Sequence, residues 1–356
     1  MKEIYVFGAG ASYASGRTPL GDELGWSYFF DANSLYRMEN GRPAIDDIEE
    51  KNIEFITFKK FLNLAKNIYP ELREDEKFER ALSRGEQYIP YNLDKRYYMD
   101  EMLRILYEKK DGESAKLIKQ LVYEHIVESS FDSRNLLYNN FLNLISKYKV
   151  RKDITIISLN YDTLLREYFD NGIDKGIYID YLVNFDCFCR KEYKYGNNIV
   201  PVIKLRGSLD WGICNECNNL SLFHWHLRRY SYDDRKCKYC NYALEPFIIL
   251  PHEEVNKKIE VLWKKAARDL RIAKKITIIG YSFPPYDKKV IELFANSMNS
   301  DVDLEVVDNE DMNERIQIRR NEIQRNYKKM FPHLNKNIKV NLGGFEKYIS
   351  DLEKKE

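Results

Sequence analysis

The stretch Ile203-Lys-Leu-Arg-Gly-Ser-Leu-Asp-Trp211, followed at once by Cys214-Asn-Glu-Cys217, decides how the rest of the chain is interpreted. The apolar residues Pro201–Ile203 are typical of a short buried strand, and Arg206-Gly207-Ser208 lies where that strand would end. In open α/β sheets, ligands bind just beyond the carboxyl ends of the strands. The stretch therefore predicts a ligand crevice, with a metal-binding module beginning beside it.

Composition and charge exclude several classes of protein. The 356 residues suffice for one large or two ordinary domains with a sizeable core. The 57 basic and 56 acidic residues give a net charge of +1, which excludes a surface coated with positive charge but allows a local basic patch. No segment approaches the roughly 20 apolar residues of a membrane span. Paired Cys-x-x-Cys spacings are typical of a reducing compartment, so we expect a cytoplasmic protein without membrane contact.

Short apolar runs that each end in a glycine-rich or polar turn predict a doubly wound, mostly parallel α/β sheet of the Rossmann-like kind. The turns are Gly8-Ala9-Gly10-Ala11-Ser12 after Ile4–Phe7, Asn160-Tyr161-Asp162-Thr163 after Ile154–Leu159, Gly280-Tyr281-Ser282 after Ile276–Ile279, and Asp308-Asn309 after Leu304–Val307. Parallel strands place their carboxyl ends at one edge of the sheet. The four turns are therefore expected to share that edge, where ligands bind.

Each turn has two interpretations. A strand ending in Gly-x-Gly begins dinucleotide-binding folds, because glycines let the backbone approach a pyrophosphate. Tyr13 stands where the third glycine of the full motif would be, so an ordinary strand–helix turn fits equally well. Ser12 can donate to a phosphate or cap a helix. Asn160 and Asp162 can point into the crevice, or they can form a turn and cap the next helix.

Residues 46–149 are predicted to form a helical insertion between the two parts of the core, 1–45 and 150–356. Apolar residues recur there at helical spacing in three stripes. The stripes begin at Phe55, Leu117 and Leu137.

Residues 211–246 are predicted to form a small zinc-binding module. Cys214-x2-Cys217 and Cys237-x2-Cys240 match a four-thiolate tetrahedral site, whose role is structural because four protein ligands leave no open position. His224 and His226 are weaker candidate ligands. The module also contains basic and aromatic residues, a mixture that single-stranded nucleic acids favour, although a solvated surface explains it more simply. These residues are Trp225, Arg228, Arg229, Tyr230, Arg235, Lys236 and Lys238.

The ordered set of motifs resembles the sirtuin-like superfamily, and specifically its prokaryotic antiphage-defence branch. The set comprises Gly8–Ser12, Leu159–Asp162, Lys204–Trp211, the paired cysteines and Ile279–Ser282, and the resemblance covers about residues 1–30 and 150–310. It implies a Rossmann-like domain with NAD bound at its junction with a structural zinc (Zn²⁺) module and a helical module. It also implies hydrolysis of NAD to ADP-ribose and nicotinamide.

The resemblance also implies roles for particular residues. Asn160 and Asp162 would hold the nicotinamide riboside end of NAD, where the glycosidic bond breaks. The phosphates and riboses would be contacted by Gly8, Ala9, Gly10, Ser12, Gly207, Ser208, Gly280 and Ser282, with Asp308 accepting from the adenosine ribose.

Arg206 departs from the family motif, which has the catalytic histidine at that position. A guanidinium does not lose its proton in proteins and cannot act as a general base. Three accounts stay open. Arg206 salt-bridges the NAD pyrophosphate in a site that only binds; Asp162, Asp210 or a histidine of the zinc module is the base; or the residue at this position has been altered.

An uncontrolled NADase would poison its host, so the resemblance implies gating by a homo-oligomer or by a defence partner such as an ATPase or translocase. The helical insertion is the expected contact surface, and nucleic acid would be engaged through such a partner. Two alternatives are a catalytically impaired sensor or assembly subunit that binds NAD or ADP-ribose, and a zinc-dependent nucleic-acid binder.

Overall fold

The computed structural model describes residues 2–16, 53–74, 99–130, 136–148, 153–165, 178–183, 185–187, 199–222, 236–309 and 316–354. The chain forms two compact units, and each is described by itself. The larger comprises Met1–Thr18 and Val127–Glu356, and the smaller comprises Pro19–Ile126.

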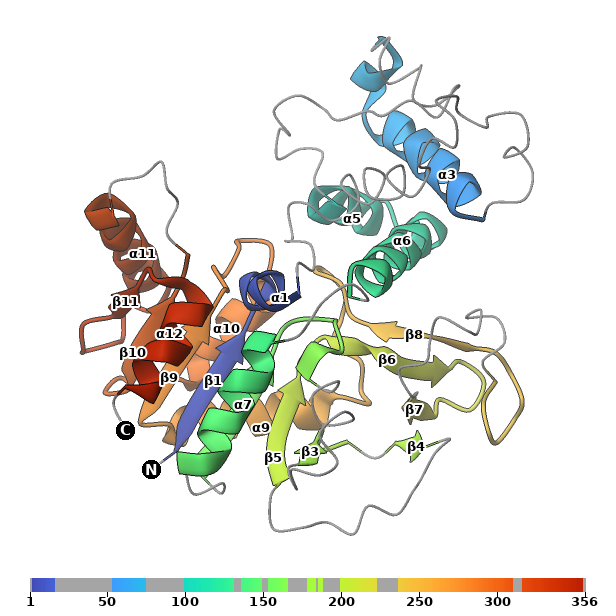
Figure 1. The fold of residues 1–356 in the computed structure, drawn as a ribbon. Helices are drawn as coiled ribbons and strands as arrows, with labels where there is room; N and C mark the ends of the chain where they lie inside the picture. The colour runs from blue at the N-terminus through green and yellow to red at the C-terminus, as the bar shows by residue number, and fades with distance from the viewer. Residues whose placement is uncertain are drawn as a thin grey trace, which may run out of the picture. The chain divides into compact units, whose positions relative to one another are not determined.

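The larger unit is built on a seven-stranded sheet in the order β11-β10-β9-β1-β2-β5-β3, and its neighbouring strands all pair in parallel (Figure 1). The strands are β1 (Glu3–Phe7), β2 (Ile154–Ser158), β3 (Tyr178–Asp180), β5 (Ile199–Lys204), β9 (Lys275–Ile279), β10 (Asp303–Val307) and β11 (Lys339–Asn341).

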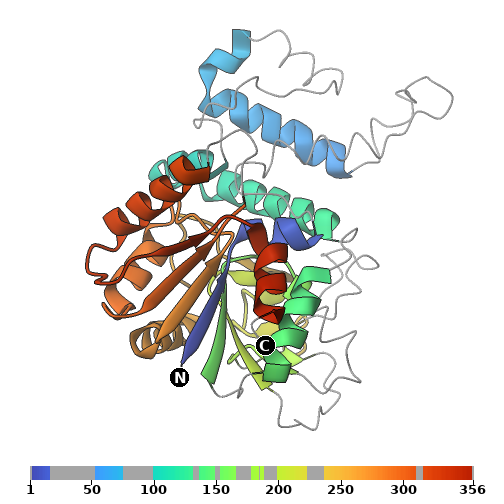
Figure 2. The same ribbon diagram turned by 60° about the vertical axis from the view of Figure 1, so that its left-hand side comes forward.

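Helices cover both faces of this sheet (Figure 2). One face carries α1 (Ala9–Gly16), α7 (Leu136–Tyr148) and α12 (Gly344–Glu353), and the other carries α9 (Glu260–Ile272), α10 (Lys288–Ser297) and α11 (Ile316–Met330). Strands covered on both faces need continuous apolar sequence, and every residue of β2 is accordingly buried. The predicted doubly wound α/β fold is confirmed.

Helix α7 packs on the sheet, although the sequence places it in the helical insertion. The Phe141 ring lies 4.9 Å from the Tyr5 ring and 5.4 Å from the Phe7 ring, and Tyr138 lies 5.0 Å from Phe7. Helical spacing showed which face of α7 is apolar but not which element covers it. The strand that covers it is β1, so α7 belongs to the larger unit.

The described residues of the smaller unit are helical. They form α3 (Ile53–Ile68), a short 3-10 helix η1 (Pro70–Glu74), α5 (Met99–Glu108) and most of α6 (Gly112–Ser130). Asp111 caps α6, because its carboxylate accepts a hydrogen bond of 3.1 Å from the Ser114 N–H. In the part of the chain that the structure describes, no helix is long and apolar enough to cross a membrane.

A second, four-stranded sheet continues from the carboxyl end of β5. Its strands, in the order β4-β7-β6-β8, are β4 (Asp186–Cys187), β7 (Leu220–Leu222), β6 (Gly207–Cys214) and β8 (Leu244–Ile248). Trp211 on β6 is fully buried, with ring centroids 4.9 Å from Phe185 and 5.5 Å from Tyr181. The turn Leu205–Arg206 thus connects the parallel sheet directly to the sheet that carries the cysteines.

Asp269 ties helix α9 to the parallel sheet. Its carboxylate is 2% exposed, accepts a hydrogen bond of 2.9 Å from Thr155 on β2, and pairs with Lys265 and with Lys2 at 3.5 Å. Burial by itself would raise the pKa of Asp269. The hydrogen bonds from Lys265 and Thr155 and the charge of Lys2 outweigh burial, so the pKa is lowered.

Asp269→Asn should lower the free energy of unfolding at pH 7 by about 1–3 kcal/mol, because it leaves buried partners unsatisfied. A carboxyl whose folded pKa is depressed stabilises the fold above its ordinary pKa of about 4 and loses that contribution as the pH falls. The difference from wild type should therefore shrink below about pH 4 in urea titrations. Asp303→Asn, at a carboxylate 66% exposed, is the control and should cost less than about 1 kcal/mol. Equal losses in the two variants would contradict this account.

Candidate functional site

The candidate site lies where the strand order of the parallel sheet reverses. From β1 the chain builds β2, β3 and β5 on one side and later returns to build β9 on the other. Ligands of doubly wound sheets bind outside the carboxyl ends of the strands at this switch point. Gly8 and Gly280 follow directly after the neighbouring strands β1 and β9, and Asn160 follows Leu159, the residue after β2.

The turns after β1 and β9 meet backbone to backbone. The Gly8 N–H donates to the Ile279 carbonyl at 3.0 Å, and the Gly10 N–H donates to the Gly280 carbonyl at 2.9 Å. A Cβ on Gly8 would lie 2.4 Å from the Tyr281 Cβ. Gly280 has φ +64°, and a Cβ there would lie 2.3 Å from the Ala11 nitrogen. The glycines are therefore required by this contact, which also uses the N–H groups of Gly8 and Gly10.

A buried polar cluster, defined by Ser12, Tyr138, Asn160 and Asp162, joins the turn after β1 to the turn after β2. The Asn160 amide donates to the Ser12 hydroxyl at 2.6 Å and to the Gly8 carbonyl at 2.8 Å, and Ser12 donates to Asp162 at 2.6 Å. The Tyr138 hydroxyl lies 3.1 Å from that of Ser12. All four residues are at most 8% exposed. The sequence singled out three of these residues but gave no signal for Tyr138, which lies next to the apolar stripe that begins at Leu137.

The structure shows the local roles of two of these residues. Ser12 lies inside α1 and does not cap it. Asp162 both faces the cluster and accepts a hydrogen bond of 3.0 Å from the Leu164 N–H, so it also forms the turn. Burial and then the Asp162 charge raise the pKa of Tyr138 well above its ordinary value, so its hydroxyl stays protonated. Lys204, only 2% exposed, donates to the Asp162 carbonyl.

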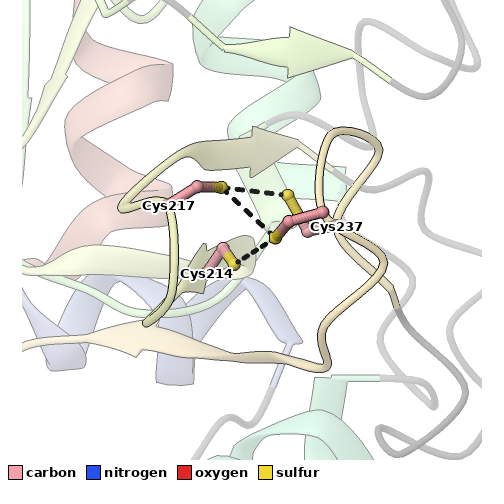
Figure 3. A group of neighbouring side chains, drawn as sticks. Cys214, Cys217 and Cys237 are labelled. Carbon is pink, nitrogen blue, oxygen red and sulfur yellow. Dashed lines mark hydrogen bonds between the residues drawn. The ribbon is translucent and has the colours of Figure 1, made fainter.

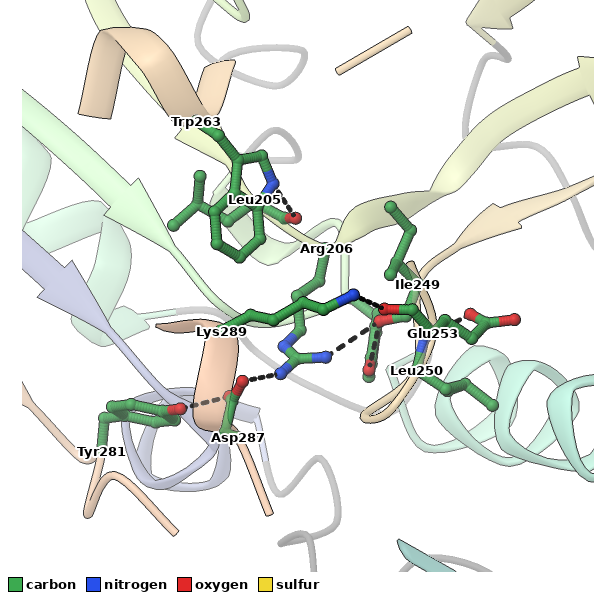
Figure 4. Close-up of polar contacts among 10 residues, drawn as sticks. Leu205, Arg206, Ile249, Leu250, Glu253, Trp263, Tyr281, Asp287 and Lys289 are labelled. Carbon is green, nitrogen blue, oxygen red and sulfur yellow. Dashed lines mark hydrogen bonds and ion pairs between the residues drawn. The ribbon is translucent and has the colours of Figure 1, made fainter. Parts of the chain in front are cut away.

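Arg206 takes part in a different set of contacts (Figure 4). Its guanidinium forms an ion pair with Asp287, the residue that directly precedes α10. It also donates a hydrogen bond of 3.1 Å to the Ile249 carbonyl. The Tyr281 hydroxyl donates to Asp287 as well. Burial would lower the pKa of Arg206, but Tyr161, Asp287 and Tyr281 outweigh it and raise that pKa. Arg206 therefore stays protonated, and its ion pair connects the turn after β5 to the start of α10.

A cavity of about 210 Å³ opens beside Arg206. Its lining includes Trp263, Tyr286, Lys289 and His252, a residue that the sequence did not single out. His252 has φ +70°, a backbone conformation rare for residues other than glycine. Of the bases considered from the sequence, Asp210 on β6 is fully buried, and His224 and His226 lie outside the described residues.

Gly207 and Ser208 hold the start of β6 against neighbouring backbone. Gly207 has φ +73°, and a Cβ there would lie 2.1 Å from the Phe247 carbonyl oxygen. The Ser208 hydroxyl donates to the Tyr161 carbonyl at 3.3 Å. In this structure Gly207 and Ser208 therefore both contact the backbone of neighbouring segments of the chain.

The side-chain hydrogen bonds of the cluster of Ser12, Tyr138, Asn160 and Asp162 do not include Ser282 or Asp308 among the described residues. Ser282 is exposed after β9. Asp308, at the carboxyl end of β10, accepts a hydrogen bond of 3.1 Å from Arg319 and one of 2.9 Å from the Asn309 N–H.

The four cysteines of the two Cys-x-x-Cys pairs converge at the end of the four-stranded sheet, and Figure 3 labels Cys214, Cys217 and Cys237. All four sulfurs lie within 4.8 Å of one another, and neighbouring pairs are 3.3, 3.3 and 3.6 Å apart. Thiolates at a Zn–S distance of about 2.3 Å have tetrahedral edges of about 3.8 Å, so the cluster fits zinc. Burial would raise the pKa of the Cys237 thiol, but the Tyr239 and Cys240 N–H groups lower it to about 7.

Comparison with known proteins gives only distant matches. No family model matches the chain, and no curated protein does. Solved structures that match include a mutant Sir2 homologue in complex with 2′-O-acetyl ADP ribose (14% identity, TM-score 0.44, covering 99% of this chain and 92% of that one). Sir2Tm bound to a propionylated peptide matches at 14% identity and TM-score 0.42, and a Sir2–p53 peptide–NAD+ complex at 12% and 0.43, each with the same coverage.

Arg206→Met should lower the free energy of unfolding by about 3–5 kcal/mol, because it leaves the buried Asp287 carboxylate without its guanidinium. Arg206→Met/Asp287→Leu should recover most of that loss. Arg319→Met, which breaks a half-exposed ion pair with Asp308, is the control and should cost about 1 kcal/mol or less. Chemical denaturation measures all three. A small loss in Arg206→Met, matching that of the control, would show that Arg206 does not hold α10.

The purified chain should contain about one zinc ion per molecule by elemental analysis. Cys217→Ser and Cys240→Ser should lose most of it, while Cys187→Ser, outside the four-cysteine cluster, should retain it. Chelation should lower the melting temperature, because zinc binding contributes directly to folding. A metal-free protein with an unchanged melting temperature would contradict the assignment.

Proposed function

We propose that this chain binds NAD at the carboxyl ends of β1, β2 and β9 and hydrolyses it to ADP-ribose and nicotinamide. The observation that carries the proposal is the preformed cluster of Ser12, Asn160 and Asp162 at the switch point of the sheet, beside the contact between Gly10 and Gly280. The motif resemblance supplies the identity of the ligand. Because the three side chains now bond to one another, NAD must replace part of this network on binding.

The proposed reaction breaks the bond between the nicotinamide nitrogen and the ribose carbon. Nicotinamide leaves with the bonding electrons, and the ribose becomes an oxocarbenium-like cation to which water adds, releasing a proton. The Asp162 carboxylate and the Asn160 amide oxygen stabilise the developing positive charge. General-base catalysis contributes about 10²–10⁴-fold, so the absence of a base at Arg206 slows hydrolysis without removing this charge stabilisation.

Further contacts with NAD are part of the proposal. Ala9 begins α1, whose N-terminus favours phosphate, and Ser12 lies within the first turn of the same helix. Gly280 and the exposed Ser282 border the same turn. Asp308 would accept hydrogen bonds from the adenosine ribose hydroxyls; its position after β10, the neighbour of β9, supports this role. Ser208 would act through its hydrogen bond to the Tyr161 carbonyl, and Gly207 through its close contact with the Phe247 backbone.

The biological setting is proposed from the motif resemblance. A chain that destroys NAD needs a gate, and we assign that role to self-association or to a defence partner such as an ATPase or translocase in a prokaryotic antiphage system. The helical unit, Pro19–Ile126, is the proposed contact surface.

A second candidate function is binding of NAD or ADP-ribose without turnover. The observation that favours it is the ion pair between Arg206 and Asp287. Arg206 cannot accept a proton, and it stands at the position of the histidine in the family that the chain resembles. Such a chain would act as a sensor or as the assembly subunit of a larger complex.

Titration calorimetry with NAD and ADP-ribose, together with chromatography of released nicotinamide, tests both functions. Wild type should bind NAD, and Asn160→Ala should slow nicotinamide release by about 10²–10³-fold, the usual loss for one preorganised polar group. Asn337→Ala, at an exposed position, is the matched control and should leave both measurements unchanged.

Affinity without release, with and without partner proteins, would establish the second function in place of the first. A folded wild type with no affinity for NAD or ADP-ribose would overturn both.

A further inference from the structure

The tip of the four-cysteine module presents aromatic rings and cations to solvent. Tyr239 and Tyr242 are 59% and 58% exposed, which makes them the two most exposed large apolar side chains of the described residues. Lys236 and Lys238 are exposed beside them. We propose that this tyrosine–lysine tip, Lys236–Tyr242, binds single-stranded nucleic acid by stacking bases on its tyrosines.

The backbone of the tip is fixed. The Cys237 N–H donates to the Tyr242 carbonyl at 2.7 Å, and the Asn241 N–H donates to the Cys237 carbonyl at 2.9 Å. Asn241 takes the left-handed conformation, φ 61°, that closes the turn, and Lys236 forms an antiparallel bridge with Ala243. Exposed rings on a rigid turn lose little conformational entropy when a flat ligand stacks on them.

The chemistry of the tip selects its ligand. Bases stack on aromatic rings whatever their sequence, and lysines placed next to the rings meet the phosphates between the bases. The Lys238 Nζ lies 5.9 Å from the centre of the Tyr239 ring, so ring and cation are close enough to contact one nucleotide. Duplex DNA offers no free base faces except at its ends. The ligand is therefore a single strand.

The balance of charges shows which contact dominates. Four thiolates around a Zn²⁺ ion would leave two negative charges at the centre of the module, which would offset the two lysines. The positive potential of the tip is therefore small, and stacking supplies most of the affinity. This proposal is independent of NAD binding, because it uses none of the residues of the switch-point site.

Fluorescence anisotropy with a labelled oligo(dT) strand of about twenty nucleotides tests the proposal in the full-length, zinc-loaded chain. Tyr239→Ala/Tyr242→Ala should weaken binding at least about tenfold, whereas Tyr239→Phe/Tyr242→Phe should stay within about threefold of wild type, because the ring faces remain. Two phosphate contacts predict a slope near −1.4 for log affinity against log salt, and Lys236→Gln/Lys238→Gln should bring that slope near zero.

Controls separate this tip from other surfaces. Lys328→Gln/Lys329→Gln removes two exposed cations of α11 and should change neither the affinity nor the slope. Zinc content and melting temperature of each variant show whether the module is folded. Wild type that does not bind, a duplex that binds as tightly as the single strand, or unchanged affinity in folded Tyr239→Ala/Tyr242→Ala would each overturn the proposal.

Discussion

The contact between the Gly8–Gly10 turn and Gly280 is the constraint on which the rest of the site depends. In it the backbones of the turns after β1 and β9 touch each other, and a side chain on either Gly8 or Gly280 would clash with the opposite turn. Helix α1 then begins at a fixed place, and Ser12 on its first turn reaches Asn160 and Asp162 after β2. A buried polar cluster is tolerated there because its members satisfy one another's hydrogen bonds. The positions of the side chains in the site thus depend on the backbone contact between the two turns.

The sequence predicted the parts of the structure that depend on local pattern. Buried parallel strands need unbroken apolar runs, and such strands share a carboxyl edge, so Asn160 and the glycine turns could be assigned to one site without coordinates. The cysteine spacings likewise predicted that the four cysteines lie together. None of these inferences needed a distance between elements far apart in the chain.

Contacts between distant side chains could not be predicted in that way. Tyr138 joins the polar cluster from a helix whose sequence shows only an apolar stripe, and that stripe does not say which strand it covers. Asp287 follows a proline-rich turn, and nothing near it in sequence indicates that it pairs with Arg206. Lys204 belonged to the predicted motif, yet its burial against the Asp162 carbonyl became apparent only in three dimensions.

The Arg206–Asp287 pair also limits how this protein can evolve. Arg206 and Tyr281 both contact the buried Asp287 carboxylate. Replacing Arg206 by an uncharged residue would therefore leave that carboxylate without its positive partner. An uncharged residue could therefore replace Arg206 only through a less stable intermediate or together with a change at Asp287. The two positions should therefore be inherited as a unit, and arginine at the first should predict an acidic residue at the second.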